Sequence, residues 1–114
     1  MYEFGKIILV PFPFTDLTSA KLRPALIVSK YREDDDIIVA FISSKSAQQE
    51  QGIYTLKTSD PDFSETGLKV DSVVRFDKIA TLNKKIVLGE LGSVGSKTVS
   101  AMAPVFFEVF GFKA

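Results

Sequence analysis

Two arginines in the 114-residue chain have neighbours that suit them to bind a phosphate. Arg23 directly precedes Pro24, and a residue before proline adopts an extended backbone, so its guanidinium should project from a defined position. Arg75 lies two residues before Asp77 in a strand-like segment, and strand alternation places these two side chains on one face and Lys78 on the other. Arginine stays charged at physiological pH and matches phosphate geometry with two parallel hydrogen bonds. Both positions are therefore candidates for an anion site.

Each arginine also has a purely structural interpretation. Arg23 would then be a surface residue at the end of a loop, and Arg75 would form an exposed ion pair with Asp77, which contributes little to stability. If the strand face lines a cleft instead, the same pair supplies a cation and a carboxylate to a reacting anion. Either segment alone leaves both interpretations open.

A third polar group follows an apolar strand, where Ser43, Ser44 and Lys45 stand in succession. Hydroxyl groups at a strand end can bind a phosphate or a ribose hydroxyl, and they can equally satisfy backbone groups in a turn. The segment alone does not separate these two roles.

The composition excludes several kinds of catalytic site. The chain has no cysteine and no histidine, so it lacks a disulfide framework, a thiolate nucleophile, the usual zinc ligands and the usual base at neutral pH. The formal net charge is zero, but four of the acidic residues form the run from Glu33 to Asp36, which predicts an exposed hairpin tip. The remaining basic surplus permits nucleic-acid binding without requiring it.

The length and the hydrophobic content predict one folded domain, residues 1–114. The longest apolar run, residues 7–14, is far shorter than the roughly 20 residues of a membrane-spanning helix. The N-terminal segment lacks the basic region and cleavable apolar core of a secretory signal. We therefore expect a cytoplasmic protein that does not enter a membrane.

Short strand-like runs occupy the first four fifths of the chain. Their spacing is typical of an all-β barrel or sandwich, and two continuous apolar runs predict strands that are covered on both faces. Pro11 and Pro13 are expected to end the pairing of the first strand and to open the loop Thr15–Leu22 that delivers Arg23. The predicted strands are residues 6–10, 25–30, 36–43, 52–58, 71–82 and 86–88.

The last fifth of the chain has the pattern of an amphipathic helix. Ser96 can cap a helix through residues 97–110, and Gly111 can close it in the left-handed conformation. Pro104 lies in its interior and predicts a kink or a split into two pieces. The expected fold is thus mainly β, a small barrel with a C-terminal helix.

The order of several motifs resembles the MazF/PemK (Kid) toxin family of type II toxin-antitoxin systems. The motifs are residues 5–29 (GKIILVPFPFTDLTSAKLRPALIVS), 41–44 (FISS), 66–85 (TGLKVDSVVRFDKIATLNKK) and 88–92 (LGELG). The resemblance implies an SH3-like barrel of the Kid/CcdB-like type, acting as a homodimer. It also implies an endoribonuclease that cuts single-stranded RNA at short sequences, without a metal ion or another cofactor. A cognate antitoxin would silence it, and DNA would be bound only through the antitoxin complex.

The resemblance also implies roles for individual residues. The residues that match catalytic positions of the family are Arg23, Ser43, Arg75 and Asp77, and the predicted RNA-binding residues are Thr15, Lys21, Ser44, Lys45 and Lys78. The family often has Gln and Arg where this chain has Lys78 and Ala80, and a histidine that some members use in the first loop is missing. These departures leave open which bases are read and which group acts as the base.

The predicted chemistry is attack by the ribose 2′-hydroxyl on the neighbouring phosphate. Arg23 and Arg75 would stabilise the developing charge, and Ser43 would orient the phosphate. Asp77 is the nearby candidate base, although an ordinary aspartate is only weakly basic at neutral pH. Two alternatives remain: a non-catalytic binding toxin of the same fold, of the kind that inhibits DNA gyrase, and a family member whose site has decayed.

Overall fold

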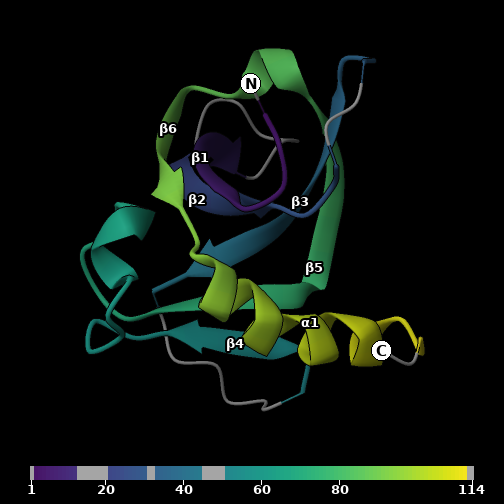
Figure 1. Cartoon of the computed structure of the whole chain (residues 1–114). Coiled ribbons are helices and arrows are strands. Elements are labelled where there is room, and N and C mark those ends of the chain that lie inside the picture. The colour runs from purple at the N-terminus through teal and green to yellow at the C-terminus, as the bar shows by residue number, and fades with distance from the viewer. Residues whose placement is uncertain (1, 13–20, 31–32, 45–50, 113–114) are drawn as a thin grey trace.

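Six strands precede one C-terminal helix in the part of the chain that the structure describes (Figure 1). This computed structural model describes residues 2–12, 21–30, 33–44 and 51–112, and for Phe12 the backbone alone. The strands are β1 (Lys6–Phe12), β2 (Lys21–Ile27), β3 (Asp36–Ser43), β4 (Ile53–Leu56), β5 (Ser72–Asn83) and β6 (Gly89–Ser93). Two 3-10 helices, η1 (Phe63–Thr66) and η2 (Lys84–Ile86), flank β5, and the helix is α1 (Ser96–Val109).

The strands form one antiparallel sheet that curls into a half-barrel with the order β4-β5-β3-β2-β1-β6. The helix α1 runs beside β4 and β5 and contacts both strands (Figure 1). The predicted architecture, mainly β with a C-terminal helix, is therefore confirmed. In the described residues, no helix is long and apolar enough to cross a membrane.

Both faces of the central strands are buried, as their continuous apolar runs predict. On β2, Leu26 belongs to a core cluster that includes Met102 of α1, whereas Ala25 and Ile27 belong to a second cluster on the other side. All three β2 residues are fully buried. Because side chains alternate along a strand, one apolar run contributes to two cores. The sheet is therefore packed on both of its faces.

The first strand runs two residues further than expected. Pro11 pairs with Leu22, and the strand continues to Phe12, so the prediction that Pro11 ends the pairing was wrong. The reason is that β6 pairs with β1 only as far as Leu9, so within the described residues Pro11 has a neighbouring strand on one side alone. A residue without an N–H group is tolerated at such an edge. As a result, Arg23 lies inside β2 and not at the end of a loop.

The prediction of a strand at residues 86–88 was also wrong. The helix η2 ends at Ile86, and the strand β6 follows at Gly89–Ser93. Glycine has a low strand propensity, which conceals β6 in the sequence. Gly92 is nevertheless required there, because a Cβ atom at this position would overlap the backbone around Glu65 of η1.

The helix α1 is continuous through Pro104, so of the two expected outcomes, a kink or a split, the split did not occur. Pro104 removes the hydrogen bond to the carbonyl of Ser100, and both residues are exposed, so water can bind that carbonyl instead. The residue that caps the N-terminus is Gly95 and not Ser96. Gly111 has a φ of 73°, which confirms the left-handed closure after the helix.

Candidate functional site

A cavity of about 220 Å³ lies where β2, β3 and β5 run side by side. It is lined by Arg23 of β2, by residues at the end of β3 and by two cations of β5. We call it the cationic cavity, and its lining residues are Arg23, Phe41, Ile42, Ser43, Ser44, Arg75 and Lys78. Residues that are far apart in the sequence and were predicted to act together thus border one space.

The strand register explains why the two arginines meet. Phe41 of β3 pairs with Ala25 of β2 on one side and with Arg75 of β5 on the other. Arg23 lies two residues before Ala25, which in antiparallel register brings it toward Ser43. The central strand therefore holds both arginines at the same cavity.

A bulge in β5 corrects the prediction about Lys78. Phe41 pairs with Arg75, but the residue before Phe41 pairs with Ile79, so residues 76–78 have no partner on β3. A bulge interrupts the simple alternation of side chains. Lys78 therefore lines the same cavity as Arg75, and its predicted place on the opposite face was wrong. The bulge supplies the cavity with a third cation.

Arg75 and Asp77 form the ion pair that their spacing predicts. The Nε of Arg75 donates to Oδ1 of Asp77 at 2.8 Å, and its Nη2 donates to Oδ2 at 2.7 Å. The side chains are 21 % and 28 % exposed, so the pair is partly shielded from water. The hydrogen bond to Asp77 raises the pKa of Arg75, and the guanidinium therefore stays charged.

The other residues at the cavity differ in exposure. Arg23 and Ser44 are exposed, whereas Ser43 is partly buried at the end of β3. Exposure of Arg23 leaves its side chain accessible to a ligand from solution. Ser43 and Ser44 present hydroxyl groups that can donate to a phosphate oxygen or accept from a ribose hydroxyl.

Three of the predicted RNA-binding residues are not placed at the cavity. Thr15 and Lys45 lie outside the described residues. Lys21 begins β2 and pairs with Phe12, and it does not belong to the cavity lining. Its exposed side chain nevertheless lies on the same strand as Arg23, two residues away.

Two apolar lining residues, Phe41 and Ile42, were not predicted from the sequence. Phe41 is partly buried, although it occupies a central strand of the sheet. The signal that could have identified these residues is their position directly before Ser43, since neighbouring residues of a strand that ends at a cavity contribute to its wall. An aromatic ring beside cations is a surface on which a nucleobase can stack.

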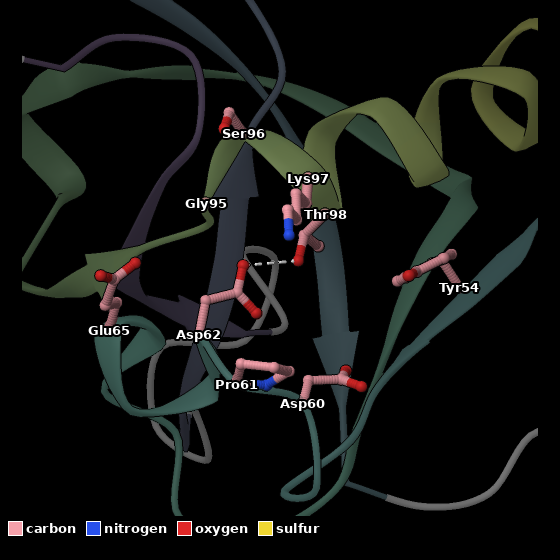
Figure 2. Close-up of a pocket in the computed structure, with 9 residues that line it drawn as sticks. All are labelled: Tyr54, Asp60, Pro61, Asp62, Glu65, Gly95, Ser96, Lys97 and Thr98. Carbon is pink, nitrogen blue, oxygen red and sulfur yellow. Dashed lines mark hydrogen bonds between the residues drawn. The ribbon is translucent and has the colours of Figure 1, made fainter.

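A larger hollow, of about 440 Å³, lies beside the N-terminus of α1 (Figure 2). Its lining includes three carboxylates, those of Asp60, Asp62 and Glu65, and one cation, Lys97. Asp62 accepts a hydrogen bond from Thr98 at 2.9 Å, as the dashed line shows. Carboxylates repel a phosphate, so the smaller cationic cavity is the better candidate for an anionic substrate although its volume is about half as large.

The fold of the chain is similar to those of solved toxin structures. An endoribonuclease in complex with its cognate antitoxin, from a Mycobacterial species, has a TM-score of 0.77 and 19 % identity, with 100 % of this chain and 99 % of that chain covered. The Mycobacterium tuberculosis toxin MazF-mt6 has a TM-score of 0.70 and 20 % identity, with coverage of 96 % and 99 %. MazF (Form-I) from Deinococcus radiodurans has a TM-score of 0.72 and 18 % identity, with 97 % of each chain covered. At these identities the likeness establishes the fold.

The family of the chain is identified from its sequence. None of the curated proteins is similar to this chain in sequence. The model of one family, however, matches residues 3–109, which is nearly the whole chain and includes every residue of the cationic cavity. The chain therefore belongs to the family of PemK-like, MazF-like toxins of type II toxin-antitoxin systems.

Proposed function

We propose that the protein is an endoribonuclease toxin that cuts single-stranded RNA at short sequences and needs no metal ion. The observation that carries this proposal is the convergence of Arg23, Arg75 and Lys78 with Ser43 on one cavity. A structure of the same fold is that of an endoribonuclease, which supports the assignment. A protein that only bound its target would not need this group of residues.

The proposed reaction uses the nucleophile of the RNA itself. The ribose 2′-oxygen attacks the adjacent phosphorus, an O2′–P bond forms and the P–O5′ bond breaks. The products are a 2′,3′-cyclic phosphate and a 5′-hydroxyl, because the 2′-hydroxyl loses a proton and the departing 5′-oxygen gains one. Negative charge develops on the phosphorane oxygens between these events, and fixed cations stabilise it.

Each residue of the predicted catalytic set has a task in this reaction. Arg23 and Arg75 approach from different strands and stabilise the phosphorane. Ser43 donates a hydrogen bond that orients the phosphate, and Asp77 completes the set through its ion pair with Arg75. Ser44 and Lys78, with Lys21, Thr15 and Lys45 as further predicted contacts, bind the RNA on either side of the scissile bond.

The family supports a proposal about the partners. We propose a homodimer of one-domain chains in the cytoplasm, silenced by a cognate antitoxin and bound to DNA only through the antitoxin complex. The complex of a similar endoribonuclease with its cognate antitoxin supports the antitoxin part of this proposal.

The test is cleavage of single-stranded RNA by the purified protein in EDTA. Fragments with 5′-hydroxyl ends are expected, and Arg23→Ala should abolish them without unfolding the protein. Lys97→Ala is the matched control, since it removes one positive charge from the other hollow and should leave cleavage unchanged.

Two outcomes would contradict the proposal. A requirement for magnesium, or fragments with 5′-phosphate ends, would exclude the mechanism. Growth arrest without RNA decay would instead identify a binding toxin with another target.

A further inference from the structure

Both carboxylate oxygens of Asp77 accept a hydrogen bond from Arg75. A group that takes a proton from a substrate must lie within hydrogen-bond reach of that proton. We propose that Asp77 is a positioning residue, which orients the guanidinium of Arg75, and is not the group that accepts the proton of the ribose hydroxyl. This inference rests on the proposed function and assigns a role within it.

The placement of the two side chains supports this division of roles. Arg75 lines the cationic cavity, whereas Asp77, two residues further along β5, is not part of the lining that the described residues form. A phosphate in the cavity would therefore meet the guanidinium, with the carboxylate bound to the edge of that group. The carboxylate acts on the substrate through Arg75.

The geometry of the ion pair leaves the tip of the guanidinium suited to a phosphate. The bonds to Asp77 use the Nε–H and one N–H of Nη2, which together form the side edge of the group. Arginine has five N–H donors, and those that remain include one on each terminal nitrogen at the tip. A tip with two parallel N–H donors matches two oxygens of a phosphate.

The backbone that carries the pair is also held in place. Within the bulge, the N–H of Phe76 donates to the carbonyl of Gly52 at 2.8 Å. The Phe76 ring, 2 % exposed, packs edge to face on Phe106 of α1 with the ring centroids 5.7 Å apart. A Cβ atom at Gly52 would lie 3.1 Å from Cγ2 of Val109 in α1 and 3.4 Å from the Cβ atom of Asp77, so the helix packs closely on the backbone beside the pair. Such preorganisation is what an electrostatic catalyst requires, since the cation need not move during the reaction.

The hydrogen bond to Asp77 also raises the pKa of Arg75, so the guanidinium keeps the positive charge that would stabilise the phosphorane.

The first test is the pH profile of RNA cleavage by Asp77→Asn. Asparagine keeps the size of the side chain, but its amide group places N–H donors opposite one nitrogen of Arg75, so the two-bonded pair cannot form. We expect kcat/KM to fall by up to about a hundredfold, the effect of misplacing a catalytic group by about 1 Å, with the shape of the profile unchanged. Loss of the acidic limb of the profile would show that Asp77 is the proton acceptor and would overturn the proposal. Asp35→Asn, which removes an exposed carboxylate elsewhere, is the control.

The second test is a double-mutant cycle with Arg75→Lys. Lysine keeps the positive charge but cannot form the two parallel bonds. If Asp77 acts only through Arg75, Asp77→Asn should change the rate by less than about twofold in the Arg75→Lys background. The full effect in both backgrounds would show that Asp77 acts independently and would overturn the proposal.

A third measurement needs no activity. In isotopically labelled protein, the Nε–H of Arg75 should exchange with water more slowly than the Nε–H of the exposed Arg23, and Asp77→Asn should remove that difference. Equal exchange in the unmodified protein would overturn the proposal. If the unmodified protein does not cut RNA in EDTA, the proposed function fails, whereas this exchange measurement still decides whether Asp77 orients Arg75.

Discussion

Two places where distant segments meet differ in how they are built. At the contact between η1 and β6, Gly67 and Gly92 allow backbone to pack directly on backbone, and a Cβ atom at either position would overlap Leu91 or Glu65. At the cationic cavity, Arg23 and the cations of β5 surround a space of about 220 Å³. In the first region, the lack of side chains allows two backbone segments to touch. In the second, charged side chains border an open space.

The difference separates stability from function. A close backbone contact allows no substitution, because the added atoms have no space to occupy. Exposed cations around an open cavity can be replaced with little effect on folding, and their like charges gain no stability from being close together. Substitutions that destabilise the fold should therefore differ from those that impair RNA cleavage.

The largest effect is expected for Gly92→Ala. The methyl group would overlap the backbone of η1, and we expect the free energy of unfolding to fall by about 4 kcal/mol or more. Chemical denaturation measures this change. Gly89→Ala is the matched control in the same strand, since its methyl group would meet only Cδ1 of Leu9 at 3.9 Å, and it should cost less than about 1 kcal/mol. Equal losses in the two variants would refute the close-packing interpretation.

The next effect is expected for Arg23→Lys, which keeps the charge but not the two parallel hydrogen bonds. Cleavage of single-stranded RNA should slow by on the order of a hundredfold. The free energy of unfolding should change by less than about 0.5 kcal/mol, since the side chain is exposed. Full activity would mean that a positive charge alone is sufficient for cleavage. Unfolding would show that Arg23 is required for the fold, as Gly92 is.

A smaller effect is expected for Lys78→Ala. Loss of one phosphate contact should weaken RNA binding by roughly 1 kcal/mol and reduce the slope of log K against log salt by about 1. Titration of RNA at several salt concentrations measures both quantities, with Lys69→Ala as a control that removes an exposed cation outside the cavity. An unchanged slope would remove Lys78 from the binding surface.

The smallest effect belongs to neither region. Asp71 is exposed, and its Oδ1 accepts from the backbone N–H of Thr58 at 2.7 Å, which lowers the pKa of this carboxyl from 3.8. Because its folded pKa lies below the unfolded value, the stability it contributes is present above about pH 4 and is lost as the pH falls through the folded pKa. Asp71→Asn should therefore be slightly less stable than the unmodified protein at pH 7 and equal to it at low pH. A constant difference across denaturation curves from pH 3 to 7 would contradict this assignment.

Local patterns were sufficient for part of the fold and of the site. The apolar run that forms β3 was predicted with the correct bounds, Asp36–Ser43. The ion pair between Arg75 and Asp77 followed from their spacing alone. In each case the determining interaction lies within one strand, so the sequence contains it.

Features that depend on contacts between segments were not predictable in this way. The bulge that brings Lys78 to the cavity is a feature of the pairing between β5 and β3, two segments that are far apart in the sequence. The strand β6 was concealed by its two glycines, of which the fold requires Gly92 because it lies against η1. The family resemblance, and not the spacing, linked Arg23 to Arg75, and the shared register with β3 is the physical reason for their contact with one cavity.

The proline within β1 has one more consequence. Beyond Leu9 no strand of the described chain covers the outer side of β1, and a bare sheet edge invites a strand from another molecule. Pro11 stands on that stretch with no N–H to offer, so an incoming chain cannot extend the ladder there. A residue that was expected to end the strand thus disfavours pairing of this edge with a strand of another molecule.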